Sequence, residues 1–125
     1  MLNHVSIGVK DLAASQRFYD AALEPLGYKR VFENPEYICY GTVAPEFCVV
    51  AVKHPVPPDD ESGLHFCFDA ARRPEVNAFH RAAIAAGGRD NGAPGLRKEY
   101  GDDYYAAFVI DPDGYRLEAY THSAN

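Results

Sequence analysis

The sequence has little of three features, and each shortage excludes a class of function. Only 12 of its 125 residues are lysine or arginine, against 18 aspartates and glutamates, so the net charge is −6. A nucleic-acid-binding surface needs a basic face, so we expect no nucleic acid as partner. No apolar run approaches the roughly 18 residues that span a membrane, so we expect no membrane association either.

Cysteine is also scarce. Cys39, Cys48 and Cys67 form an odd set without paired spacing, and each lies in an apolar run typical of a strand. We interpret them as buried, reduced thiols, with a reactive thiol as the alternative. The N-terminus has neither a basic flank nor an uninterrupted apolar core, so it does not resemble a signal peptide. Together these features predict a cytoplasmic protein.

What the sequence does contain is an internal repeat. Residues 63–88 align with residues 2–27 without a gap when they are shifted by 61 positions. Two copies of one supersecondary unit predict a pseudo-symmetric site between them, where both halves can hold a metal ion. The matched pairs are His65 with His4, Phe79 with Phe18, Ile84 with Leu23, and Gly88 with Gly27.

The two copies are expected to contain the same elements within one domain of residues 1–125. Alternation and helical periodicity predict a first module over 1–53, a stiff proline-rich connector over 54–62, and a second module over 63–125. In the first module we expect a strand over 2–10, a helix capped by Asp11, and strands near 28–34, 36–44 and 46–53. In the second we expect a strand over 63–69, a helix begun by Pro74, a short strand near 88–91, an irregular segment over 91–103, and strands over 104–110 and 115–121 around a turn at 111–114.

This order predicts an α+β fold of two βαβββ modules. A single helix covers only one face of a four-stranded sheet, so the faces that carry His4 and His65 need other cover. We therefore expect the modules to form an eight-stranded, incompletely closed, barrel-like sheet around a central cavity.

The last strand adds a carboxylate to this cavity. Leu117 and Ala119 are expected to face the helix, which turns Glu118 inward, where a carboxylate is costly unless it is paired or coordinated. With His4 and His65, Glu118 makes a two-histidine, one-carboxylate set that suits divalent Fe, Mn, Co, Ni or Zn and leaves coordination positions open. The alternative is that both histidines are satisfied in the core and that the carboxylate pairs with Arg116 or Arg97.

Three motifs resemble those of the vicinal oxygen chelate superfamily, which includes glyoxalase I, extradiol dioxygenases, fosfomycin-modifying transferases and bleomycin-binding proteins. They are His4-Val-Ser-Ile-Gly-Val-Lys-Asp-Leu with Phe18-Tyr19 downstream, Leu64-His65-Phe, and Asp111-Pro-Asp-Gly-Tyr-Arg-Leu-Glu118. The resemblance implies paired βαβββ modules, a homodimer, and a metal ion that binds a small substrate through two neighbouring oxygens. It also implies ligands at His4, in strand 46–53, at His65 and at Glu118. In glyoxalase I the second ligand is a glutamate, whereas here the matching residue is Ala51, which cannot ligate.

Three further residues are candidates for catalysis. Arg97 and Tyr100 lie in the long segment 91–103, which is placed to act as a lid over the cavity or else is a solvated loop. Tyr104 and Tyr105 begin a strand, so only one of them can face the cavity and hydrogen-bond a substrate oxygen. We take Tyr104 as that residue.

These observations predict a metal-dependent lyase, isomerase or ring-cleaving dioxygenase that acts on a small substrate. One alternative is a metal-free drug-binding protein, which needs no inward carboxylate. The other is a fosfomycin-type thiol transferase, for which Arg97, Lys98 and Arg116 are the available basic residues. The stiff connector also allows one chain's first module to close against the second module of another chain.

Overall fold

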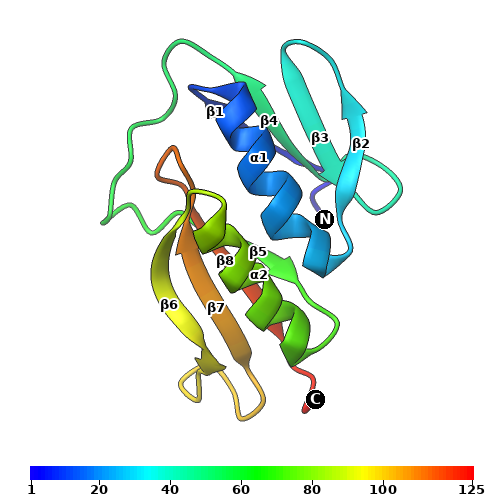
Figure 1. The fold of residues 1–125 in the computed structure, drawn as a ribbon. Coiled ribbons are helices and arrows are strands. Elements are labelled where there is room, and N and C mark those ends of the chain that lie inside the picture. Colours follow the sequence, from blue (N-terminus) through cyan, green and yellow to red (C-terminus); the bar gives the residue numbers. More distant parts are fainter.

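The computed structural model describes residues 1–125 as two βαβββ modules (Figure 1). The first contains β1 (Val5–Val9), α1 (Leu12–Leu23), the short 3-10 helix η1 (Glu24–Leu26), β2 (Lys29–Glu33), β3 (Tyr37–Gly41) and β4 (Phe47–Ala51). The second contains β5 (Phe66–Asp69), α2 (Arg73–Ala85), β6 (Arg89–Leu96), β7 (Tyr105–Ile110) and β8 (Arg116–Thr121). Neither helix is long and apolar enough to cross a bilayer.

Each module folds into its own four-stranded sheet. The strand orders are β1-β4-β3-β2 (sheet A) and β5-β8-β7-β6 (sheet B). The parallel pairs are β1 with β4 and β5 with β8. The helices begin at Leu12 and Arg73, which are 61 positions apart, as the repeat requires. The predicted α+β fold is therefore confirmed. Each sheet is a separate hydrogen-bonded ladder, so the barrel is not closed.

Helix α1 has clear sequence signals at both ends. The Asp11 carboxylate accepts a hydrogen bond from the backbone N–H of Ala14 at 3.1 Å, which satisfies one of the free donors of the first turn. Beyond η1 the chain turns at Gly27, whose φ of 87° favours glycine. Between these ends a stripe of side chains is fully buried: Ser15, Phe18, Tyr19, Ala22 and Leu23.

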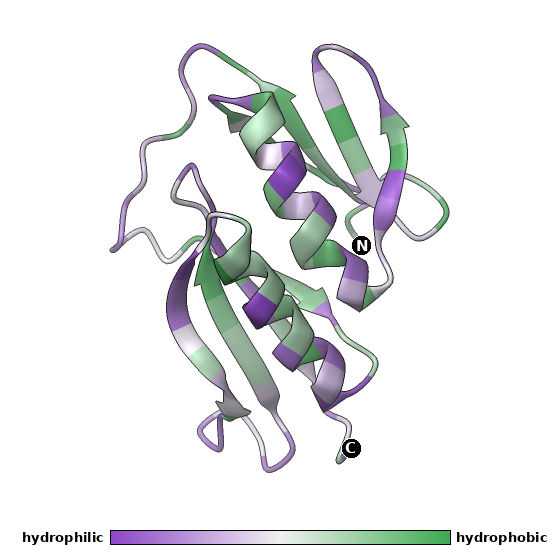
Figure 2. Cartoon of the chain, in the orientation of Figure 1, coloured by the Kyte–Doolittle hydropathy of each residue, from purple (hydrophilic) through white to green (hydrophobic).

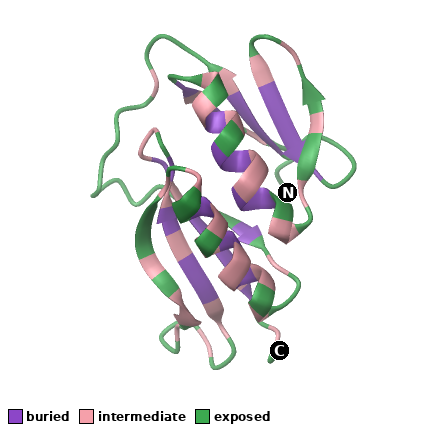
Figure 3. Ribbon diagram, in the orientation of Figure 1, coloured by how far each residue is buried: buried purple, intermediate pink, exposed green.

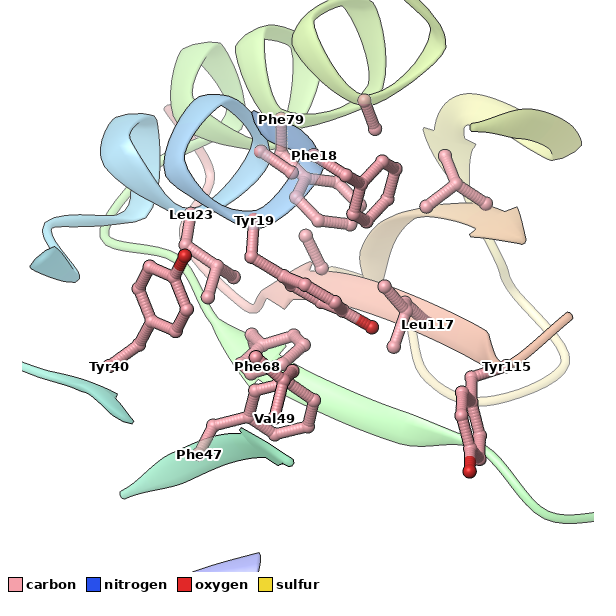
Figure 4. Close-up of a cluster of buried hydrophobic side chains, with 14 of the residues drawn as sticks. Phe18, Tyr19, Leu23, Tyr40, Phe47, Val49, Phe68, Phe79, Tyr115 and Leu117 are labelled. Atoms are coloured by element: carbon pink, nitrogen blue, oxygen red, sulfur yellow. The ribbon is translucent and has the colours of Figure 1, made fainter. Parts of the chain in front are cut away.

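Both helices contribute to one core. Phe18 and Phe79, which the repeat aligns, are each completely buried where α1 and α2 pack together (Figure 4). Phe47 of sheet A meets Phe66 and Phe68 of sheet B, with ring centroids 5.8 and 5.2 Å apart. Buried residues follow the central strands of both sheets and the inner sides of the helices, whereas the connector is exposed and largely hydrophilic (Figures 2 and 3).

The turn at 111–114 joins the modules. The buried Asp111 carboxylate accepts a 2.5 Å hydrogen bond from the Tyr19 hydroxyl of α1, and bonds of 2.9 and 2.8 Å from the backbone N–H groups of Asp113 and Tyr115. Burial raises the pKa of Asp111, although these three donors oppose the shift. The most distinctive motif of the sequence thus has a structural role.

The same turn also contacts the start of the chain. The Asp113 carboxylate accepts from the backbone N–H of Lys10 at 2.8 Å, and the Tyr115 hydroxyl donates to the Gly8 carbonyl at 2.7 Å. The segment between β1 and α1 is therefore fixed by the second module.

Segment 91–103 differs from the expectation. β6 continues through the glycine-rich stretch to Leu96, because β7 offers a ladder in which Gly95 pairs with Ala106 and Leu96 with Tyr105. Register shifts on both sides of Gly92 absorb the irregularity. The irregular loop is consequently short, and it begins at Arg97.

The expectation of three reduced thiols is wrong. Cys39 of β3 and Cys48 of β4 lie opposite each other in the antiparallel ladder, with Cα atoms 4.0 Å apart, and form a disulfide. Their sequence separation of nine did not signal the pair, because a hairpin places them in register. Cys67 is free, and it is exposed rather than buried.

Candidate functional site

The site residues lie on the faces of the two sheets that point away from the helices, which we call the open faces. In β8, Leu117 and Ala119 are buried in the core beneath the helices, as predicted, so alternation places Glu118 on the open face of sheet B. Glu118 is only 3% exposed, although the open face is not covered by a helix. Neighbouring side chains must therefore cover its carboxylate, and these side chains make up the candidate site.

Glu118 is held by two donors. One carboxylate oxygen, Oε1, lies 3.0 Å from Nε2 of His65, and the other, Oε2, accepts a 2.5 Å hydrogen bond from the Tyr104 hydroxyl. The predicted alternative partners are both elsewhere. Arg116 pairs with Asp60 at 2.6 Å, and Arg97 donates to the Ala93 carbonyl at 2.7 Å.

Burial beside this carboxylate changes the acidity of its neighbours. Loss of solvent, reinforced by the bond to Glu118, raises the pKa of Tyr104 above its ordinary value. Cys67 is exposed as a residue, but its thiol lies against Glu118, and desolvation followed by the Glu118 charge raises the pKa of the thiol to about 12. Both groups therefore carry their protons at neutral pH, and Tyr104 is available as a hydrogen-bond donor.

Only one of the two adjacent tyrosines faces this site, as the alternation of a strand requires. The Tyr105 hydroxyl donates to Asn77 of α2 at 2.7 Å, and the Arg73 guanidinium lies 5.0 Å from its ring centroid. Tyr105 thus belongs to the helix side, and Tyr104 is the tyrosine on the open face.

Arg97 and Tyr100 lie at the edge of the same face. The Arg97 guanidinium carbon is 5.3 Å from the centroid of the Phe108 ring. Tyr100 is 66% exposed, and its ring centroid is 5.3 Å from that of Tyr104, which in turn is 4.2 Å from Tyr120. Tyr100, Tyr104 and Tyr120 thus form a row of aromatic rings beside Glu118, which we call the aromatic row.

His4 lies apart from the His65–Glu118 pair. Its Nδ1 is 2.7 Å from the Asn3 side-chain oxygen, and it lines a hollow of about 720 Å³ on the open face of sheet A with Ser6, Cys48 and others. No group of three or more His, Cys, Asp and Glu side chains is arranged to hold a metal ion within this single chain. The structure thus brings together two of the three predicted metal ligands.

The strand register corrects the position assigned to the missing fourth ligand. Ala51 pairs with Val9, and alternation places it on the side of Phe47 and Val49, which are buried in the core. It therefore does not share a face with His4.

Cys48 is the residue that does correspond to Glu118. In sheet B, Glu118 pairs with Cys67, and in sheet A the residue 61 positions earlier, Ser6, pairs with Cys48. Sequence reasoning missed Cys48 as a site residue. Extending the repeat to the parallel strand pairs would have identified it.

Comparisons with known proteins agree with this fold. The chain is 30% identical to the protein YqjT of Bacillus subtilis (strain 168) over 122 residues, which are 94% of this chain and 95% of that protein. A glyoxalase/bleomycin resistance protein from Albidiferax ferrireducens T118 matches with a TM-score of 0.82 and 35% identity, over 96% of this chain and 97% of that chain. A glyoxalase-related enzyme from Fulvimarina pelagi matches with a TM-score of 0.74 and 25% identity, over 96% and 86% respectively.

A family model also matches nearly the full length. The model of the Glyoxalase/Bleomycin resistance protein/Dioxygenase superfamily covers residues 1–119, and so includes both modules and every candidate ligand. The paired βαβββ modules are thus the fold of an established family, and the chain belongs to the Glyoxalase/Bleomycin resistance protein/Dioxygenase superfamily.

Proposed function

We propose that the protein is a metal-dependent enzyme, a lyase, isomerase or ring-cleaving dioxygenase, whose small substrate presents two neighbouring oxygens to the metal. The proposed metal ligands are His65 and Glu118 of one chain and His4 of a second copy of the chain. The enzyme class is supported by the likeness to the glyoxalase-related enzyme of Fulvimarina pelagi.

The observation that carries the proposal is the contact between Glu118 and His65. A carboxylate that is 3% exposed needs strong partners, and its Oε1 lies 3.0 Å from an imidazole nitrogen whose side chain is 47% exposed. An imidazole nitrogen and a carboxylate oxygen this close together, reached by solvent from the histidine side, are suitable donors for Fe, Mn, Co, Ni or Zn. The donor set therefore fits a divalent metal, which when bound supplies Lewis acidity toward the substrate oxygens.

The distance of His4 from this pair is the reason for a second copy. His4 and His65 occupy repeat-related positions on the open faces of different sheets, and the chain leaves both faces free of helices. Packing sheet A of one copy against sheet B of another brings the two faces together and covers them. A homodimer of this kind forms two equivalent sites.

The remaining residues act on the substrate through hydrogen bonds and charge. The Tyr104 hydroxyl donates a hydrogen bond to Glu118 and can donate instead to a substrate oxygen. Arg97, which is held over Phe108 at the edge of the face, supplies a positive charge for an anionic substrate group. Tyr100 and Tyr104 provide apolar ring surface that excludes water.

Metal-free ligand binding is the second candidate, and one observation favours it. Both oxygens of Glu118 already have a partner, one in Tyr104 and the other in His65, so the carboxylate is satisfied without a metal. In that case the aromatic row binds a planar ligand and Glu118 only orders the binding face.

Metal affinity separates the two candidates. Protein purified without chelator is titrated with Zn²⁺ against a chromophoric chelator under non-reducing conditions. We expect Glu118→Gln to bind the ion at least about tenfold more weakly, because the variant keeps the shape but loses the anionic donor. Glu33→Gln is the control, because that carboxylate lies on β2 and pairs with Arg30. Equal affinity of Glu118→Gln and the parent would support metal-free binding.

A mixing experiment tests whether two copies share the site. His4→Gln and Glu118→Gln chains are each expected to bind metal weakly. When they are unfolded together and refolded, the mixed dimer regains one intact site, formed by His4 of the Glu118→Gln chain and the intact pair of the other. No recovery of tight binding, or a monomeric mass of about 13.8 kDa by light scattering, would refute the shared site.

A further inference from the structure

Two glycines of β6 make room for the Arg97 side chain. A methyl group on Gly95 would lie 3.2 Å from one terminal nitrogen of the Arg97 guanidinium. A methyl group on Gly92 would lie 3.2 Å from the other terminal nitrogen and 2.9 Å from the Phe108 ring. The guanidinium therefore lies against the backbone of β6, in space that larger residues at these two positions would fill.

The contacts that hold Arg97 leave most of its donors free. One terminal nitrogen donates to the Ala93 carbonyl at 2.7 Å, and the guanidinium carbon is 5.3 Å from the centroid of the Phe108 ring, within the range of a cation–π interaction. A guanidinium has five N–H donors, so four have no acceptor in the chain. Arg97 also forms no ion pair, although the net charge is −6. It is a positioned cation with donors available to a ligand.

Aromatic side chains adjoin this cation. The backbone N–H of Arg97 donates to the Tyr104 carbonyl at 2.8 Å, which extends the β6–β7 ladder and sets the two residues opposite each other. In the turn that follows, the N–H of Tyr100 donates to the Arg97 carbonyl at 3.0 Å. Both tyrosines belong to the aromatic row, and Tyr100 is largely exposed. A ligand that reaches Arg97 therefore meets an apolar surface beside the positive charge.

We propose that Arg97 binds the carboxylate of a planar aromatic acid whose ring packs on the aromatic row, and that Gly92 and Gly95 position the guanidinium for this contact. The inference deepens the proposed function, on which the identification of this acid as the substrate rests. It assigns the substrate a chemical class and gives the glycine-rich stretch of β6 a role in selecting it.

Charge and shape favour a carboxylate over a phosphoryl group. One guanidinium balances a single negative charge, and its planar fork of donors matches the two oxygens of a carboxylate. A phosphoryl dianion calls for a second cation, but Arg116 of the same face is already paired with Asp60 at 2.6 Å. The subsite thus suits a singly charged, planar anion.

The spacing of the strands allows one molecule to reach both Arg97 and the proposed metal. Phe108 of β7 pairs with Gly92 of β6 on one side and with Glu118 of β8 on the other. Neighbouring strands lie about 4.8 Å apart, so β6 and β8 are separated by about 10 Å. A substrate with an aromatic ring between its carboxylate and its chelating oxygens spans a distance of this order.

Benzoate is the probe, and benzamide is its uncharged counterpart of nearly the same shape. ¹⁵N-labelled protein, treated with chelator to remove metal, is titrated with each compound, and the shifts of the backbone N–H resonances of β6 and β7 give the affinities. We expect benzoate to bind at least about tenfold more tightly than benzamide, because hydrogen bonds between charged groups are the stronger ones. Equal affinities would overturn the proposal.

Variants of Arg97 test the cation. Arg97→Gln should abolish the preference for benzoate, and Arg97→Lys should restore only part of it, because an ammonium group lacks the planar fork. Arg81→Gln is the matched control, since it removes the same charge from an exposed position on α2 and should bind benzoate as the parent does. An unchanged preference in Arg97→Gln would refute the assignment.

Gly95→Ala tests the positioning role. The new methyl group should displace the guanidinium and weaken benzoate binding several-fold, with benzamide binding unchanged. If Gly95 acts only through Arg97, adding Gly95→Ala to Arg97→Gln should cause no further loss, whereas a further loss would contradict that role. The titrations are independent of metal. Failure of benzoate binding therefore leaves the Zn²⁺ experiment on Glu118 intact, and failure of that experiment leaves the anion subsite intact.

Discussion

The bond between Tyr19 and Asp111 predicts that one oxygen atom in the core has a large effect on stability. Tyr19 is completely buried, and its hydroxyl donates to the Asp111 carboxylate at 2.5 Å across the two modules. Tyr19→Phe keeps the ring and removes only the donor. Hydrogen bonds to charged groups contribute about 1.5–3 kcal/mol, and Asp111 retains two backbone donors, so we expect a loss of about 2 kcal/mol.

Tyr40→Phe is the matched control. Tyr40 is also buried, and its hydroxyl donates to Asp20 at 2.8 Å, but the Asp20 side chain is 35% exposed. Water can replace the lost donor there, so we expect a cost of about 1 kcal/mol or less. Urea denaturation followed by circular dichroism measures both, with the m-value as a check that the unfolded state is unchanged. If Tyr19→Phe costs no more than Tyr40→Phe, the reasoning is refuted.

The same bond predicts a pH dependence. Burial, followed by the Asp111 charge, raises the pKa of Tyr19 well above its ordinary value. A raised pKa in the folded state gives stability that is fully present below the unfolded pKa of about 10 and is lost as the pH rises above it. We therefore expect the stability difference between the parent and Tyr19→Phe to shrink from pH 9 to pH 11. A constant difference over that range would show that Tyr19 ionises equally in both states.

Four further substitutions, one of them a control, test the packing and one ion pair by the same denaturation assay. Phe79→Ala should cost about 3–5 kcal/mol because the ring is fully buried between the helices, whereas Ile84→Ala, at a 38% exposed position of the same helix, should cost far less. Gly88→Ala should cost about 1–3 kcal/mol because the new methyl group would lie 2.6 Å from Phe18 and 2.9 Å from the Ala83 carbonyl; stability equal to the parent would show that α2 can shift. Asp60→Asn should change stability by less than about 1 kcal/mol, because its pair with Arg116 is solvent-exposed on the Asp60 side, and a larger loss would mean that the connector is held mainly by this bond.

The sequence predicted the two-module fold well because the pattern of apolar residues carries it. Alternation identified Leu117 and Ala119 as core residues and Glu118 as an open-face residue, and the Asp11 cap of α1 was predicted correctly. It failed at β6, because glycines have no side chain from which a strand period can be read. There the ladder with β7 determines the structure.

The site was predicted only in part, because contacts between strands depend on register. The proximity of His65 and Glu118 follows from parallel neighbours in one module. The Cys39–Cys48 bond depends on how the β3–β4 hairpin is aligned, and a shift of one residue would have turned the two sulfurs to opposite faces. The hydrogen bond from Tyr104 to Glu118 was missed, and the arginines expected as alternative partners find acceptors outside the site.

The order of strands in sheet B has a consequence for protein synthesis. β5 has β8 as its neighbour, and β8 also separates β5 from β7. The second module therefore cannot assemble until Arg116–Thr121 have left the ribosome, whereas sheet A needs nothing beyond Ala51. Until then, the apolar residues of β5 and β7 remain exposed in the nascent chain, where they can associate with other chains. Truncation after Tyr115 would remove β8, which lies in the middle of this sheet rather than at its edge, and with it Glu118.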